Sequence, residues 1–148
     1  MFKRILLPLD GSKFSETAFE TGVNLAKQLG ASIIITHIVD QTMFENILAP
    51  VPGGPVEMAK PIYEDIQAKS EVFLKQKLEL CRERGVEGQS ILKMGHPVNT
   101  IIDLANEMKV DLIVIGSHGR ARLGALTLGS VAYGVIHKSQ DIAVLVVR

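Results

Sequence analysis

Short apolar runs alternate with stretches of helical periodicity along the chain. The apolar runs predict five strands, at residues 5–7, 32–38, 89–93, 111–115 and 142–147. Between them, apolar positions recur at helical spacing and predict four helices, at residues 12–29, 62–84, 97–108 and 130–138. Strands that are apolar on both faces are typical of a parallel sheet covered by helices on each side. The pattern therefore predicts a three-layer α/β/α sandwich around an open, five-stranded, mainly parallel sheet.

Small and polar residues mark the ends of the predicted helices. Ser12 can cap the first helix, and Gly30 supplies the left-handed conformation that is common after a helix. Gly85 ends the second helix in the same way. Pro97 suits the first position of the third helix, because its missing N–H is not needed there.

The pattern breaks at residues 41–61. This segment holds several prolines and a glycine pair: Pro50, Pro52, Gly53, Gly54, Pro55 and Pro61. Such a composition predicts that no regular element forms there. A segment of this length is either a flexible flap with a function or a plain disordered insertion.

The overall composition indicates one domain, at residues 1–148, and excludes several classes of protein. Sixteen Lys and Arg balance sixteen Asp and Glu, so the chain has no general attraction for nucleic acid or anionic membranes. Cys81 is the only cysteine, which excludes an internal disulfide, and its helical context indicates a passive thiol. No apolar run reaches the ~20 residues of a membrane helix, and the N-terminus does not resemble a signal peptide. We therefore expect a cytoplasmic protein.

A glycine-rich segment follows the fourth predicted strand. Gly116, Ser117, His118 and Gly119 are followed, after nine residues, by Gly129 and Ser130 at the start of a helix. Glycine lets a phosphate approach backbone N–H groups that a Cβ would block. The helix start adds unpaired N–H groups and a partial positive charge. The alternative is that these glycines only end a strand and begin a helix. The spacing matches neither a Walker loop nor a dinucleotide fingerprint.

The end of the first strand offers a second candidate region, at Leu9, Asp10, Gly11 and Ser12. In open parallel sheets, ligands bind beyond the carboxyl ends of the strands. If the first and fourth strands are neighbours, both loops face one crevice. Asp10 would then accept a hydrogen bond from a ribose or from an adenine amino group. Its alternative role is to cap the following helix.

Other polar residues give weaker signals. Arg120 and Arg122 either donate charge-assisted hydrogen bonds to phosphates or are solvated loop charges. His118 suits local packing or hydrogen bonding better than the role of a general base. The four histidines are not spaced as metal ligands, and neither paired carboxylates nor a nucleophile beside a base is evident. The sequence therefore predicts no catalytic and no dedicated metal site.

The chain resembles the universal stress protein family over essentially its whole length. The similar segments are ILLPLDGS at 5–12, HIVD at 37–40, GHP at 95–97, DLIVIGSHG at 111–119, LGSV at 128–131 and AVLVV at 143–147. The family's ATP-binding signature is Gly, two residues, Gly, nine residues, then Gly and Ser or Thr. Gly116, Gly119, Gly129 and Ser130 meet it. The chain is therefore similar to the ATP-binding branch of the family.

This resemblance implies a Rossmann-like fold, similar to adenine nucleotide alpha hydrolases, with strand order 3-2-1-4-5. It also implies a site for ATP, ADP or AMP, with Mg²⁺ held through the phosphates. Pro8, Leu9 and Asp10 would meet the adenosine half, and Ile38 would pack against adenine. Ile115 and Gly116 would line the floor of the pocket. The phosphates would lie among Gly119, Gly129, Ser130 and Val131, with Ser117, His118 and Arg120 nearby.

The last predicted strand, at 142–147, is apolar throughout and suits a sheet edge that pairs with a second copy. The resemblance implies such a homodimer. We therefore expect a nucleotide-responsive regulatory module in a stress response, read by a protein partner that the sequence does not identify. The alternatives are a slow ATPase or phosphoryl-transfer enzyme, and a purely structural dimer. Phosphoryl transfer needs a positioned nucleophile, and no water-positioning carboxylate is evident, so at most weak ATP hydrolysis is expected.

Overall fold

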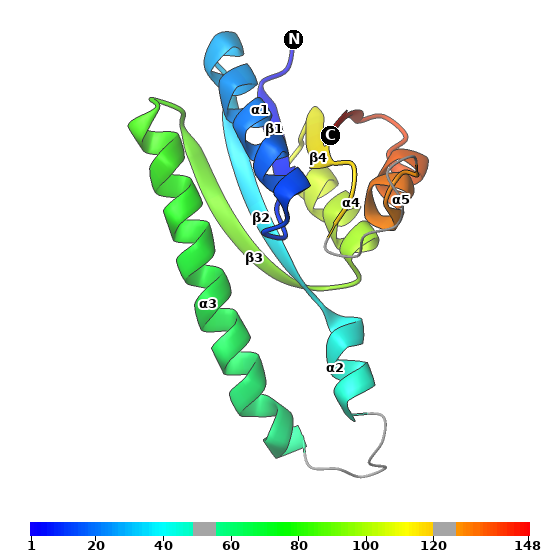
Figure 1. The fold of residues 1–148 in the computed structure, drawn as a ribbon. Helices are drawn as coiled ribbons and strands as arrows, with labels where there is room; N and C mark the ends of the chain where they lie inside the picture. The colour runs from blue at the N-terminus through cyan, green and yellow to red at the C-terminus, as the bar shows by residue number, and fades with distance from the viewer. Residues whose placement is uncertain (49–55, 120–126) are drawn as a thin grey trace.

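The computed structural model describes residues 1–48, 56–119 and 127–148, in which strands and helices alternate except for two successive helices after the second strand (Figure 1). The strands are β1 Arg4–Pro8, β2 Ser32–Asp40, β3 Gly88–Gly95, β4 Leu112–Gly116 and β5 Ala143–Val147. The helices are α1 Lys13–Leu29, α2 Gln41–Leu48, α3 Val56–Glu83, α4 Pro97–Glu107 and α5 Ser130–Lys138. All five predicted strands and all four predicted helices are present, and α2 is an additional helix.

The strands form one sheet in the order β3-β2-β1-β4-β5, and every described pairing is parallel. The central strand β1 sets the register, because Ile5 lies opposite Ile33 of β2 and Leu112 of β4. This confirms the predicted fold class and strand order. It also makes β1 and β4 neighbours, so their carboxyl ends meet at one edge of the sheet.

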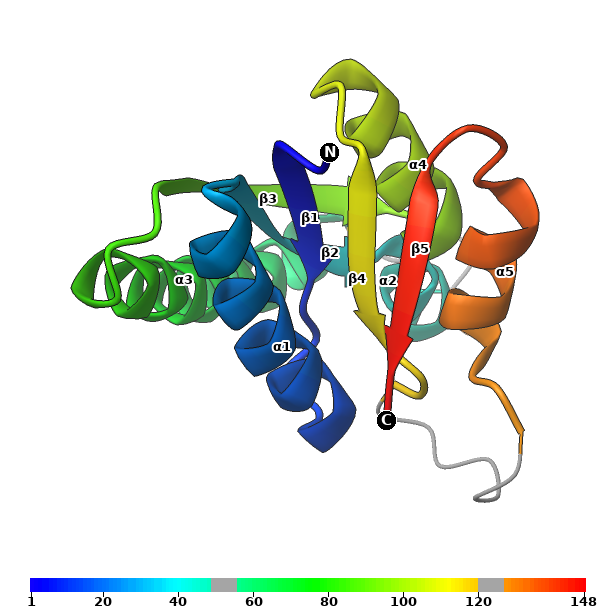
Figure 2. The same cartoon turned by 90° about the horizontal axis from the view of Figure 1, so that it is seen from above.

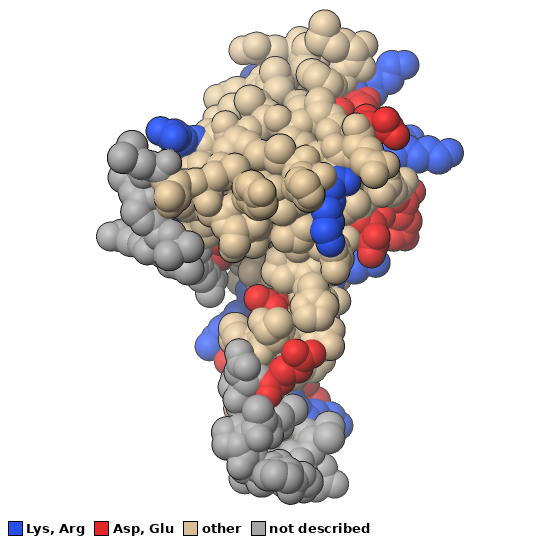
Figure 3. Space-filling view, turned by 90° about the vertical axis from the view of Figure 1, so that its right-hand side faces the viewer, with Lys and Arg blue, Asp and Glu red and all other residues tan. Residues whose placement is uncertain are grey.

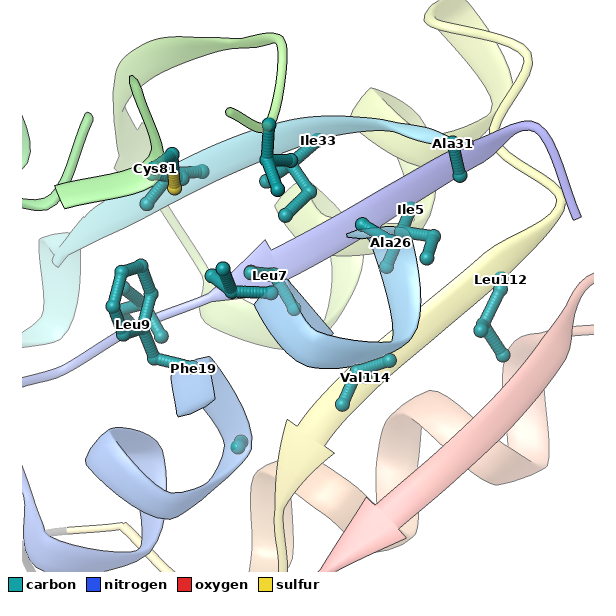
Figure 4. Close-up of a cluster of buried hydrophobic side chains, with 14 of the residues drawn as sticks. Ile5, Leu7, Leu9, Phe19, Ala26, Ala31, Ile33, Cys81, Leu112 and Val114 are labelled. Atoms are coloured by element: carbon teal, nitrogen blue, oxygen red, sulfur yellow. The ribbon is translucent and has the colours of Figure 1, made fainter. Parts of the chain in front are cut away.

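Helices cover both faces of the sheet, with α1 and α3 on one side and α4 and α5 on the other (Figure 2). Successive residues of a strand point to opposite faces, so Ile5 and Leu7 pack against α1 (Figure 4) and Leu6 packs against α4 and α5. Phe19 of α1 is fully buried on the first face. The two cores fix the sheet between its helices and hold the loops at its carboxyl edge in place.

The predicted helix ends are confirmed in detail. The Ser12 hydroxyl accepts a hydrogen bond from the Ser15 amide at 3.2 Å and caps α1. Gly30 and Gly85 have φ values of 65° and 73°, the left-handed region that favours glycine. Pro97 is the first residue of α4.

The expectation for residues 41–61 is wrong where the structure describes them. Helix α2 begins at Gln41 because the Asp40 carboxylate accepts hydrogen bonds from the Thr42 amide at 3.0 Å and hydroxyl at 2.7 Å. Helix α3 begins at Val56 and includes Pro61, whose missing N–H removes only one intrahelical bond. The remaining prolines and both glycines of the segment fall at 49–55, outside the described residues.

Strand β5 lies at the sheet edge, as predicted, and pairs only with β4 among the described residues. Leu145 is 37% exposed and Ala143 is also exposed on this strand. Within the described ranges, none of the helices combines the length and the apolar character needed to cross a membrane.

Candidate functional site

The turn after β1 is held by the neighbouring strand β2. The Leu9 amide donates to the Thr36 carbonyl at 2.8 Å, and the Leu9 carbonyl lies 2.7 Å from Nδ1 of His37. A carbonyl only accepts, so His37 must carry its proton on Nδ1 when it is neutral. Both backbone groups of Leu9 are thus fixed, and Asp10 follows directly at the carboxyl edge.

Asp10 supports the turn that leads into α1, but the N-cap of that helix is Ser12 and not Asp10. Its Oδ1 accepts a hydrogen bond from the Ser12 amide at 2.9 Å. The hydroxyl of Ser15 accepts from the amides of Asp10 and Gly11 at 3.3 and 3.2 Å. Gly11 has a φ of 79°, which the turn requires. Asp10 is half-buried, so part of the residue is accessible to solvent.

The turn after β4 lies beside this turn. A Cβ added to Gly119 would stand 3.0 Å from Oδ2 of Asp10. The fold therefore brings together two residues that are more than one hundred positions apart in the sequence. This close approach follows from the β1–β4 pairing, which makes the two turns neighbours, as the sequence predicted.

Gly129 packs on the same turn and leads into α5. A Cβ at Gly129 would lie 2.8 Å from the Ser117 carbonyl oxygen and 2.9 Å from Cα of His118. Its amide donates to that carbonyl at 2.7 Å, so this amide is already used within the protein. Gly129 is the N-cap of α5, and no side chain caps the helix. The first amides of a helix have no intrahelical partner, and the exposed Ser130 stands there.

Glycine is needed at position 116 for helix packing and not for a ligand. A Cβ at this position would lie 2.8 Å from the carbonyl carbon of Phe14, so the glycine lets α1 pack on the end of β4. The aromatic ring of Phe14 also contacts the ring of His118, with centroids 5.0 Å apart. Ser117 is 1% exposed, and its hydroxyl lies 2.9 Å from Nδ1 of His118. Ser117 and His118 are therefore part of the packed turn.

Two residues predicted to line the base side of the pocket, Ile38 and Ile115, contact the core beneath α4 and α5. Val131 of α5, predicted near the phosphates, contacts the same core. Leu9 does not join them, because its side chain is 3% exposed in the core beneath α1 and α3. Pro8 ends β1 and is half-buried. Arg120 lies outside the described residues.

A cavity of about 170 Å³ adjoins Asp10 on the side of α3. It is lined by Asp10, Gly11, His37, Lys69, Ser70 and Phe73. The sequence did not predict the α3 residues, because only helical spacing places them on one face. A second cavity of about 110 Å³, between α4 and the turn before β5, contains no predicted site residue. Among the described residues, no group of three His, Cys, Asp or Glu side chains is placed to hold a metal ion.

Comparison with known proteins agrees with this architecture. The sequence profile of the universal stress protein family matches residues 1–148. The chain belongs to the universal stress protein family. Universal stress protein MJ0531 of Methanocaldococcus jannaschii is 34% identical over 149 residues, which cover 100% of this chain and 83% of that protein.

Solved structures of the family have the same fold. The structure of protein MJ0577 superposes with a TM-score of 0.85 at 26% identity, covering 99% of this chain and 96% of that one. A universal stress protein from Archaeoglobus fulgidus was solved in complex with dAMP. It superposes with a TM-score of 0.64 at 23% identity, covering 100% of this chain and 98% of that chain. At this identity the superposition shows the fold alone.

Proposed function

We propose that this universal stress protein binds an adenine nucleotide, ATP in the first instance, in the crevice between the β1 and β4 turns. The observation that carries the proposal is the approach of Gly119 to Asp10, where an added Cβ would stand 3.0 Å from Oδ2. A side chain there would fill the space between the two turns. The dAMP complex of the Archaeoglobus fulgidus neighbour supports an adenine nucleotide as the ligand class.

In this proposal the ligand would contact three parts of the fold. The Asp10 carboxylate is at the mouth of the β1 turn, where it would accept hydrogen bonds from ribose hydroxyls or an adenine amino group. Ile38 and Ile115, on the face of α4 and α5, would contact the base. The phosphates would lie at the N-terminus of α5, where the helix dipole favours anions.

The Gly129 amide does not contact the phosphate in this proposal, so the phosphate contacts begin one residue later, at Ser130. Because the Gly129 amide already binds the Ser117 carbonyl, the amides available to a phosphate are those of Ser130 and Val131. The exposed Ser130 hydroxyl can add a further hydrogen bond. A Mg²⁺ ion would be held by the phosphates, since Mg²⁺ commonly binds through substrate phosphates and retained waters.

We further propose that the bound nucleotide regulates a homodimer formed through β5, which a partner protein reads. The support is the exposed outer edge of that apolar strand. Phosphoryl transfer needs a positioned nucleophile, whereas the one acidic side chain that the proposal uses, Asp10, is assigned to the adenosine half. The arrangement therefore favours binding over catalysis.

The substitution Gly119→Ala tests the crevice. Its Cβ would crowd the Asp10 carboxylate, which must move by a few tenths of an ångström. We expect the ATP dissociation constant, measured by calorimetry, to rise about tenfold, equivalent to about 1.4 kcal/mol. The thermal midpoint should change little, because the contact is with a side chain.

Gly30→Ala is the matched control for this experiment. Gly30 has a φ of 65° at the end of α1, and nothing lies within 4 Å of an added Cβ. Alanine there costs roughly 1–2 kcal/mol of stability, and ATP affinity should be unchanged. Unaltered affinity in Gly119→Ala would remove the support for this placement of the nucleotide.

A further inference from the structure

Ser117 joins the glycine-rich turn to the outer strand of the sheet. Its amide donates to the Val147 carbonyl at 2.7 Å, just beyond the last β4–β5 pair, Gly116 and Val147. Its carbonyl accepts from the Gly129 amide, also at 2.7 Å. The residue is 1% exposed, so water does not compete for these bonds. A continuous path of two main-chain hydrogen bonds therefore runs from the N-terminus of α5 to the end of β5.

The contact between α5 and Ser117 is tight. The space beside Gly129 is too small for a Cβ, which would lie 2.8 Å from the Ser117 carbonyl oxygen. Atoms in such close contact move together, because packed protein interiors transmit strain. A displacement or stiffening of the first turn of α5 must therefore reach Ser117, and through it Val147.

The same turn contains an unsatisfied polar atom. Nε2 of His118 is the one buried side-chain nitrogen or oxygen without a hydrogen-bond partner in the part of the chain that the structure describes. His118 is 8% exposed, and its ring is held between the Ser117 hydroxyl and Phe14. A buried group without a partner favours any other arrangement that gives it one. The turn is therefore the part of the site best suited to a second conformation.

We propose that Ser117 transmits occupancy of the nucleotide crevice to β5, so that phosphate bound at the α5 N-terminus strengthens the pairing of β5 with a second copy of this chain. This inference rests on the proposed function and adds its regulation. An anion that draws the Ser130 and Val131 amides together fixes Gly129, which fixes the Ser117 carbonyl and hence the Ser117–Val147 bond. The ligand can act in this way only if it binds the ordered arrangement of the turn more tightly than the second conformation.

Amide hydrogen exchange, followed by NMR on 15N-labelled full-length protein, tests the path with ATP as the probe. Saturating ATP is expected to slow exchange about tenfold or more at both Gly129 and Ser117, beyond the slowing at Ser32. The Ser32 amide bonds to the Lys3 carbonyl at the opposite end of β2, and it reports overall stabilisation by the ligand.

Two failures of this experiment are distinguishable. If calorimetry detects no ATP binding, the proposed function fails and this inference fails with it. If ATP binds and slows exchange at Gly129, but Ser117 changes only as much as Ser32, the path through Ser117 is refuted and nucleotide binding stands.

Sedimentation with and without ATP tests the consequence for assembly. Coupling between sites is reciprocal, so ATP should lower the dimer dissociation constant, and dimer formation should raise ATP affinity, by the same factor of about five or more. Leu145→Lys places a charge on the 37% exposed edge residue of β5 and should remove both effects. Val72→Lys, at a 56% exposed position on α3, is the matched control and should remove neither. A dimer constant that ATP leaves unchanged would overturn the proposal.

Discussion

The three glycines of the signature are required for three different physical reasons. Gly116 lets α1 pack on β4, and Gly129 lets α5 begin against the Ser117 carbonyl. Gly119 faces the carboxylate of Asp10, which we propose binds the nucleotide. A substitution at Gly129 would therefore displace the turn as well as a phosphate, and its effect on binding would be ambiguous. A substitution at Gly119 is therefore the one expected to change nucleotide binding with the least effect on folding.

Cys81 provides a prediction that is independent of the nucleotide. The thiol is fully buried, and desolvation raises its pKa from 9.0 to about 11. Between those two values the folded chain holds the proton that the unfolded chain releases. The thiol's contribution to stability is therefore complete below pH 9 and is lost as the pH rises to 11, by about 3 kcal/mol in total.

Urea denaturation across pH 8 to 11 measures this loss. The free energy of unfolding of Cys81→Ala should fall less steeply than that of the wild-type chain over the same range. Parallel pH dependence in the two proteins would show that the thiol does not titrate differently in the folded and unfolded states.

At the scale of elements, α3 carries a proline that weakens its first turns. Pro61 is an interior residue of the helix and offers no N–H to the carbonyl four residues earlier. Pro61→Ala should restore that bond and slow amide exchange at residues 62–66 about tenfold, with little change in global stability. Pro97→Ala is the control, because the first residue of α4 needs no N–H. Equal exchange in wild-type and Pro61→Ala would mean that these turns already form fully.

The sheet and four of the helices were predictable because apolar periodicity and helix caps pointed to the same elements. The error at 41–61 has a local cause. Proline and glycine dominated the composition, while the signal for α2 was a single Asp40–Thr42 cap. Proximity of Asp10 and Gly119 followed from the order of the strands. The hydrogen bond of the Gly129 amide could not be predicted, because no sequence pattern indicates which amides of a turn bond within the protein.

At the scale of the molecule, two helices of the first face are joined by ion pairs. The Arg84 guanidinium donates two hydrogen bonds to Glu20, at 2.7 and 2.9 Å, and Lys77 pairs with Glu16. Arg84 also lowers the pKa of the Glu20 carboxyl through these hydrogen bonds. These contacts link α1 to α3 and to the turn that follows it, on the face of the sheet behind the β1 turn.

The opposite side of the molecule differs in surface chemistry. The face that carries α5 shows few charged side chains among the described residues (Figure 3). Tyr133 and Ile136 of α5 are 62% and 43% exposed there. Such a surface beside the exposed edge of β5 fits the proposed contact with a second copy, because interface cores are poor in charge.

The central claim is the position of the nucleotide, and a 15N NMR titration of the wild-type chain with ATP tests it most directly. Saturable shifts are expected at the amides of Ser130 and Val131, with Asp10 changing at the same ATP concentrations. Lys69 and Phe73, which line the neighbouring cavity, should shift less. Shifts confined to that cavity, or no saturable shift at the first turn of α5, would contradict the account.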